Sequence, residues 1–183
     1  MKTLCAVFSA LILASAAYGQ GTILFANNGQ TQITNFVSMA PITGPGDYKF
    51  GLYVALFGST PSTLVTVTTN GLIAGTFQGG NVSLALTPGT QLSFQVRGWS
   101  SFAGNTYEEA YALALTQTPP YPLVGQSTMG FFTIPSSGTI SIFGTGPGQV
   151  GGFYLTSVIP EPSTFALALL GLALWSARRA CKK

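Results

Sequence analysis

Histidine is absent from the sequence and cysteine is scarce. The 183 residues include no histidine and two cysteines, Cys5 and Cys181, one close to each end. The lack of histidine removes the commonest metal ligand and the general base of Ser-His catalysis. A central region without thiols offers no ligand for zinc or for an iron–sulfur cluster. We therefore expect no metal site and no cofactor, and the single carboxylate of the turn at 44–47 is too little for calcium.

Charged residues make up only 6% of the chain, and three carboxylates, Asp47, Glu108 and Glu109, lie in its central part. A glycosidase needs two carboxyl groups that face each other across a cleft. Glu108 and Glu109 are adjacent and point in different directions, so a pair would have to recruit Asp47 from a distant turn. We expect no enzymatic activity. Instead, Glu108 is expected to cap a helix, and one of the two glutamates to pair with Arg97.

The positive charge of the chain lies at its ends. The formal net charge is +3, but five of the seven basic residues are terminal: Lys2, Arg178, Arg179, Lys182 and Lys183. Residues 20–158 contain two basic residues, Lys49 and Arg97, and three acidic ones, so their net charge is −1. Two cations cannot supply a phosphate-binding footprint, so we expect no nucleic-acid partner.

The first 19 residues have the pattern of a secretory signal peptide. Lys2 supplies a positive charge, an apolar stretch runs from Leu4 to Ala17, and small residues at Ala17 and Gly19 precede Gln20. This order predicts cleavage by signal peptidase after Gly19 and export through the inner membrane.

The other end of the chain carries an apolar run with a basic end. The run extends from Phe165 through Leu170 and Trp175 to Ala177, and it is uncharged. It is shorter than the roughly 20 residues that usually span a bilayer. The basic residues behind it predict a cytoplasmic end for a short transmembrane helix. A buried C-terminal helix is the alternative, but such a helix would be amphipathic, whereas this run is apolar on every side.

Pro160-Glu161-Pro162, the apolar run and the arginines Arg178-Arg179 follow one another in a recognisable order. Over residues 159–183 the chain resembles the PEP-CTERM sorting signal of Gram-negative bacteria, although a plain arginine run is commoner there than the Ala-Cys-Lys-Lys found here. The resemblance implies that an exosortase, a membrane-embedded transpeptidase-like enzyme, recognises the Pro-Glu-Pro motif and removes the tail. It also implies transient membrane anchoring, a final place at the cell surface or outside the cell, and a link to exopolysaccharide and biofilm.

Residues 20–158 are predicted to form one all-β domain. Apolar residues alternate with polar ones, and Gly, Pro and Asn-Gly turns separate short runs. In Tyr48–Leu56, for example, every second side chain from Tyr48 to Leu56 shares one face. The pattern predicts an antiparallel β-sandwich, of jelly-roll or immunoglobulin-like kind. The expected strands are Thr22–Ala26, Thr31–Val37, Tyr48–Leu56, Leu64–Thr68, Leu72–Phe77, Asn81–Leu86, Gln91–Arg97, Thr128–Ile134, Thr139–Phe143 and Phe153–Val158.

One short helix interrupts the β pattern. Asn105 and Glu108 have the spacing of a capping box, with Asn105 as the N-cap, and predict a helix over Tyr107–Leu115. Val96–Trp99 followed by Gly104–Ala110 also resembles a segment of exported PEP-CTERM proteins of the verrucomicrobial kind. That resemblance covers about 15 residues and implies no activity.

Two functions remain open for the central domain. The leading hypothesis is a non-enzymatic structural or adhesive component of the cell surface or matrix. The alternative is a lectin-like module for exopolysaccharide, because Trp99, Tyr107 and Tyr121 lie in or beside loops where aromatic faces can stack on sugars. The same aromatic residues also serve as ordinary core and rim packing in a sandwich.

Overall fold

The structure is a computed structural model that describes residues 21–116 and 119–158. The expected signal peptide (1–19) and the sorting tail (159–183), with its predicted transmembrane helix around Phe165, Leu170 and Trp175, lie outside the described residues. Within the described part, no helix is both long enough and apolar enough to cross a bilayer.

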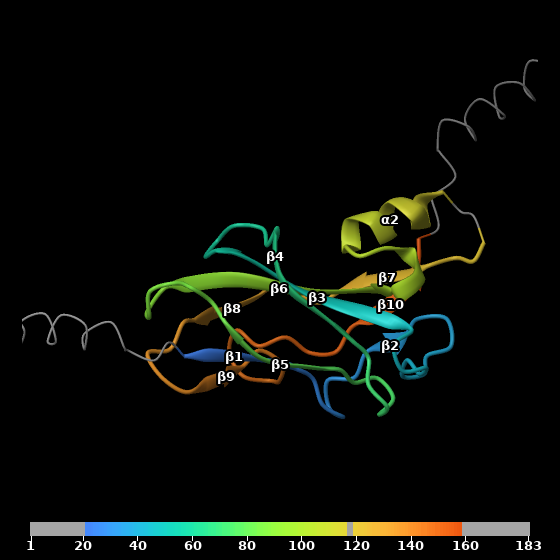
Figure 1. The fold of residues 1–183 in the computed structure, drawn as a ribbon. Coiled ribbons are helices and arrows are strands. Elements are labelled where there is room, and N and C mark those ends of the chain that lie inside the picture. Colours follow the sequence, from blue (N-terminus) through green and yellow to red (C-terminus); the bar gives the residue numbers. More distant parts are fainter. Residues whose placement is uncertain (1–20, 117–118, 159–183) are drawn as a thin grey trace, which may run out of the picture.

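The described chain is mostly β-structure with one short α-helix (Figure 1). The strands are β1 Thr22–Ala26, β2 Thr34–Asn35, β3 Tyr48–Leu56, β4 Thr63–Thr69, β5 Gln78–Ser83, β6 Gln91–Ser100, β7 Leu123–Gln126, β8 Gly130–Thr133, β9 Thr139–Ser141 and β10 Tyr154–Ser157. A 3₁₀ turn, η1 (Ser101–Ala103), and the helix α2 (Tyr107–Leu115) follow β6. This composition is consistent with the predicted β-sandwich.

The strands form two sheets. A three-stranded sheet has the order β5-β1-β9, and a seven-stranded sheet has the order β2-β10-β7-β6-β3-β4, with β8 also paired to β6. β7 and β8 both pair with β6, β7 near its end and β8 near its start. Between them Ser127 keeps the ladder together, because its N–H donates to the Val96 carbonyl (2.8 Å) and its Oγ accepts from the Val96 N–H (3.1 Å).

The sheets are not wholly antiparallel, which corrects the expectation from sequence. β9 pairs with β1 in parallel, and β10 pairs with β2 in parallel. In each pair the two strands are more than 100 residues apart in the chain. Such pairs depend on how long connections cross the molecule, and the alternation of side chains carries no information about that.

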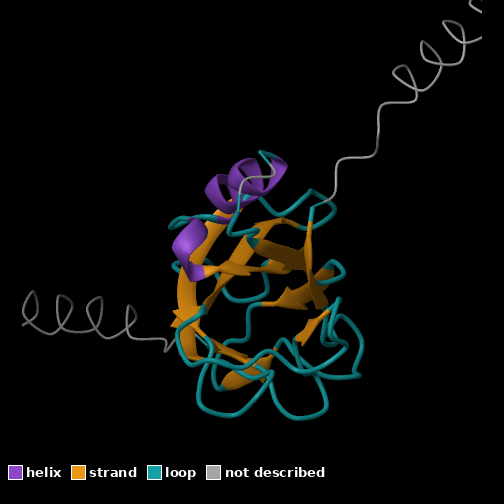
Figure 2. Cartoon of the chain, turned by 90° about the vertical axis from the view of Figure 1, so that its right-hand side faces the viewer, coloured by secondary structure: helices purple, strands orange, loops and turns teal. Residues whose placement is uncertain are grey.

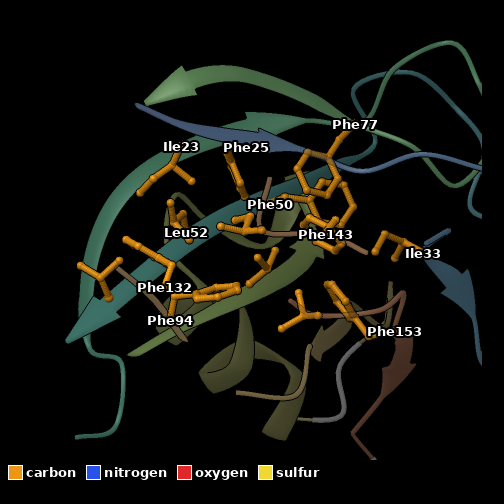
Figure 3. Close-up of a cluster of buried hydrophobic side chains, with 14 of the residues drawn as sticks. Ile23, Phe25, Ile33, Phe50, Leu52, Phe77, Phe94, Phe132, Phe143 and Phe153 are labelled. Carbon is orange, nitrogen blue, oxygen red and sulfur yellow. The ribbon is translucent and has the colours of Figure 1, made fainter. Parts of the chain in front are cut away.

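A main core rich in phenylalanine fills the space between the two sheets (Figure 3). Phe50 from β3 stacks on Phe77, with ring centroids 4.6 Å apart and planes at 14°. Phe77 also meets Phe25 of β1 and the edge of Phe143. Each buried phenylalanine removes a large apolar area from water, so this cluster is the main source of stability.

A smaller outer core lies on the other side of the seven-stranded sheet, where α2 packs. Figure 1 shows α2 on the side of this sheet that faces away from β1, β5 and β9, and Figure 2 shows the same helix from the end of the molecule. The outer core comprises Trp99, Ala103, Ala110, Ala114 and Val124, with Tyr107 and Val158 packed against it.

Several predicted elements agree with the structure to the residue, namely β1, β3 and α2. The predicted strand Leu72–Phe77 is wrong: Leu72 and Ile73 are exposed in a loop, and the strand of this region is β5, which follows it. Thr31–Val37 contains only the two-residue strand β2, and β7 was not predicted. Leu56 ends β3 as an exposed residue, so the apolar face of that strand stops at Val54.

Candidate functional site

The five charged residues of the described chain gather at one place, around the start of α2. They are Asp47, Lys49, Arg97, Glu108 and Glu109. The pairing of β3 with β6 sets Lys49 opposite Trp99, and the carbonyl of Asp47 accepts from the Ser101 N–H. α2 begins a few residues further on and brings its two glutamates to the same end of the sheet. The rest of the described surface is uncharged, so this is the place to look for chemistry.

The helix is capped by Thr106 rather than by the predicted Asn105. Thr106 Oγ1 accepts from the Glu109 N–H (3.2 Å), and Glu109 Oε2 accepts from the Asn105 N–H (2.7 Å). Asn105 instead accepts from Lys49 through Oδ1 (3.0 Å). The prediction missed the register by one residue, because Asn105-Thr106 and Glu108-Glu109 offer the same spacing twice. As a result Glu109 belongs to the cap and Glu108 is available for other contacts.

Glu108 pairs with Arg97, as one of the glutamates was expected to do. Arg97 Nη1 lies 2.7 Å from Glu108 Oε1. The Tyr53 hydroxyl donates to Glu108 Oε2 (2.9 Å) and accepts from the Tyr107 N–H (3.3 Å). Both oxygens of Glu108 are therefore occupied, which ties the first turn of α2 to β3 and β6.

The guanidinium of Arg97 is held from several sides. It lies over the ring of Tyr53 at 4.2 Å and over the ring of Tyr107 at 5.4 Å. Its Nη2 donates to the carbonyl of Pro61 (2.7 Å), and its Nε donates to Gln95 (3.1 Å). A cation over aromatic faces with its donors satisfied is typical of a structural arginine.

The tyrosines of this network favour their neutral form. Burial, together with the hydrogen bond to the Glu108 carboxylate, raises the pKa of Tyr53 to about 12, although the hydrogen bond from Tyr107 opposes the rise. Burial likewise raises the pKa of Tyr107. Both phenols therefore stay protonated near neutral pH, where they act as hydrogen-bonding groups and not as bases.

The three residues predicted to contact sugar lie in different surroundings. Trp99 is 0% exposed, and its Nε1–H donates to the carbonyl of Gly104 (3.1 Å). Its ring therefore serves the outer core and is not available for stacking on a ligand. Tyr121 is exposed ahead of β7, and Tyr107 is half-buried on α2. Tyr107 lies in a hollow of the surface.

This hollow is a shallow depression of about 330 Å³ beside α2. Its lining includes Arg97, Tyr107, Glu108, Tyr111 and Gln126. The rings of Tyr107 and Tyr111 stack at 5.9 Å with planes at 24°, as their spacing of four residues on a helix allows. Gln126 was not singled out from the sequence, because the strand β7 that carries it was not predicted. Aromatic faces next to amide, carboxylate and guanidinium groups could hold a small polar ligand.

Among the described residues there is no cluster of three or more Asp, Glu, His or Cys side chains that could hold a metal ion. The turn at 44–47 is a tight backbone turn, closed by a hydrogen bond from the Asp47 N–H to the Gly44 carbonyl (3.0 Å). A larger hollow of about 490 Å³, lined by residues such as Phe94, Phe131 and Gln149, has no ionisable side chain in its lining.

Comparison with known proteins bears on the tail. Residues 158–183 match the family model described as the PEP-CTERM protein-sorting motif. No curated protein and no solved structure matches the chain. The match confirms the resemblance of the tail, while the verrucomicrobial type stays a prediction. A PEP-CTERM sorting motif implies that the chain is exported, that an exosortase sorts it, and that its destination is the cell surface or the extracellular space.

Proposed function

We propose that the protein is a non-enzymatic structural or adhesive component of the cell surface or of an exopolysaccharide matrix. The observation that carries the proposal is the sorting motif at residues 158–183, directly behind a small β-domain. The contacts of the charged residues support it, because Arg97, Glu108 and Glu109 hold α2 in place instead of facing one another across a cleft.

The proposal includes two processing steps. Signal peptidase removes residues 1–19, and the apolar run from Phe165 to Ala177 then anchors the chain until an exosortase acts at Pro160-Glu161-Pro162. During this stage Arg178, Arg179, Lys182 and Lys183 hold the end of the chain on the cytoplasmic side.

Intact-mass measurement of the exported protein tests these steps in a host that carries an exosortase. The expected product lacks residues 1–19 and the basic end, and the variant Glu161→Ala keeps the basic end. Ser163→Ala, outside the Pro-Glu-Pro motif, is the matched control and is processed normally. A wild-type product that retains Arg178 and Lys183 would show a permanent anchor and contradict the proposal.

Carbohydrate binding is a second candidate, favoured by the stacked rings of Tyr107 and Tyr111 beside Gln126. A glycan array with the processed protein, including exopolysaccharide of the producing cell, tests it. If sugar binds in the depression, Tyr111→Ala weakens binding about tenfold or more, because a stacking face is lost. Tyr121→Ala removes an exposed aromatic ring outside the depression and leaves binding unchanged. Silence across the array would remove this candidate and leave the structural role.

A further inference from the structure

The turn that follows β2 exposes apolar side chains to solvent. Phe36, Val37 and Met39 are all exposed, Val37 by 75%. Residues 36–40, which we name the apolar turn, contain no charged residue. The ring of Phe36 meets the edge of the exposed Tyr154 ring at 5.9 Å and 87°. Several large apolar side chains side by side on a surface usually mark a contact with another apolar phase.

The backbone holds the apolar turn in a defined shape. Asn35 Oδ1 accepts from the Val37 N–H (2.8 Å), and the Asn35 N–H donates to the Ala40 carbonyl (2.9 Å). Met39 has φ +53°, a left-handed conformation that is strained for residues other than glycine. Glycine or asparagine would take this position more cheaply. A methionine held there against its preference suggests that the exposed apolar side chain has a use.

The apolar turn lies at the end of the domain from which the tail departs. β2 and β10 run in parallel, with Tyr154 opposite Thr34 and Leu155 opposite Asn35, and the Phe36 N–H donates to the Leu155 carbonyl (2.9 Å). The residues that follow Asn35 and those that follow Leu155 therefore run toward the same end. Figure 1 shows β2 and β10 near this end, whereas β1 begins at the opposite one.

The chain between the domain and the apolar run is short. Val158 packs against the outer core, and the apolar run begins at Phe165. Seven residue steps span at most about 25 Å even when fully extended. A bilayer that holds the apolar run therefore lies within about that distance of Val158. An uncharged turn with an aromatic pair suits the membrane interface, where aromatic rings gather and apolar side chains reach about 5–10 Å deep.

We propose that the apolar turn rests on the outer surface of the inner membrane while the tail is inserted. Phe36, Val37 and Met39 enter the interfacial region of the lipid, and Tyr154 lies beside them at headgroup level. The domain is then held in one orientation, which keeps the Pro160-Glu161-Pro162 motif near the bilayer surface where a membrane-embedded enzyme works. The inference rests on the proposed transient anchoring by the tail.

Quenching of tryptophan fluorescence by lipids with brominated acyl chains tests the contact, with the full chain in phosphatidylcholine–phosphatidylglycerol vesicles. The wild-type protein reports tail insertion through Trp175. Phe36→Trp combined with Trp175→Phe reports the apolar turn. Phe57→Trp combined with Trp175→Phe is the matched control, because Phe57 has a similar exposure (56% against 51%) and follows the far end of β3. The buried Trp99 gives the same background in every variant.

The expected result is quenching and a blue shift for the tryptophan introduced at position 36, and neither for the one at position 57. Quenching of the wild type without quenching at position 36 would overturn the membrane contact and leave the anchoring intact. No loss of Trp175 fluorescence would overturn the anchoring and the contact together. Equal quenching at positions 36 and 57 would overturn a directed contact. A concentration-dependent blue shift at position 36 without vesicles would assign the turn to a second copy of the chain, and so overturn the membrane proposal.

Discussion

The inner face of the seven-stranded sheet is packed with phenylalanines from both sides of the main core, whereas its outer face packs one tryptophan, Trp99, against the alanines of α2. The main core has many large side chains that share the burial of apolar area. The outer core has one large fully buried side chain, Trp99, and around it lie hydrogen bonds and the Arg97–Glu108 ion pair. On the inner face the buried apolar area is spread over many residues. On the outer face a few residues make most of the specific contacts.

This contrast predicts two different responses to mutation. Loss of a main-core ring leaves a cavity that the two sheets cannot close, so the whole domain is weakened. Loss of an outer-core contact affects the docking of α2, while both sheets keep their ladders. The depression beside Tyr107 and Tyr111 should respond in the second way, because most of its lining residues lie on α2.

Phe50→Ala should have the largest effect. Phe50 is fully buried and stacks on Phe77 at 4.6 Å, so we expect a loss of about 3–5 kcal/mol in the free energy of unfolding. Denaturant unfolding of the processed protein measures it. Phe131→Ala, which removes an exposed ring on β8, is the control and should cost far less. Equal costs for the two variants would contradict a main core centred on Phe50.

Trp99→Phe should come next and should act locally. The change removes the Nε1–H donor to the Gly104 carbonyl and leaves a void beside Ala110, a cost of about 2–3 kcal/mol. Amide hydrogen exchange should rise in α2 and stay unchanged in β1 and β5. A uniform rise in all three elements would show that the two cores form one cooperative unit, and the comparison between them would fail.

Alkaline pH should also destabilise the outer face, by less than Trp99→Phe does. Tyr53 has an ordinary pKa of 10.0 in the unfolded chain and a pKa of about 12 in the domain, so the unfolded state loses its proton first. The stabilisation of the folded domain by the protonated Tyr53 is therefore complete below pH 10, and it is lost as the pH rises toward 12. We expect Tyr53 to contribute about 1–2 kcal/mol to the free energy of unfolding. This is less than the full pKa difference would give, because the Glu108 side chain that Tyr53 contacts is 58% exposed to solvent.

Melting temperatures between pH 9 and pH 12 measure this effect. Tyr53→Phe should flatten the dependence, and the raised pKa values of Tyr48 and Tyr107 should leave a weaker slope. A slope that Tyr53→Phe leaves unchanged would assign the dependence to the other tyrosines.

The two faces also differ in how far the sequence could predict them. The alternation in Tyr48–Leu56 and in Gln91–Arg97 predicted the inner face, because every second residue there is apolar, and Phe50, Leu52, Phe94 and Val96 are buried as expected. The outer face has no such pattern. Trp99 was predicted as a possible sugar contact because it lies beside a loop, where an aromatic face can stack on a sugar. Trp99 is buried because α2 covers it, and this tertiary packing leaves no local pattern in the sequence.

The pairing of strands that are distant in the chain was not predicted either, because it also depends on tertiary packing. The parallel pairs β1 with β9 and β2 with β10 join segments that carry no mutual signal in the sequence. Leu72 and Ile73 have the composition of a strand, yet β5 forms from the glycine-containing segment after them, where β1 offers a partner. The helix α2 was predictable because its signals are local: alanines, and a capping pattern just before Tyr107.

That capping pattern gives the smallest expected effect and the finest test of the outer face. Thr106→Ala removes the acceptor for the Glu109 N–H and should cost about 1 kcal/mol. Asn105→Ala, the residue that the sequence favoured as the cap, removes only an acceptor for Lys49, which keeps its bond to the Gly104 carbonyl (3.0 Å), and should cost less. Denaturant unfolding of the two variants side by side measures the difference. A larger cost for Asn105→Ala than for Thr106→Ala would identify Asn105 as the N-cap. Glu108 would then occupy the third helical position and serve the cap, which contradicts its pairing with Arg97.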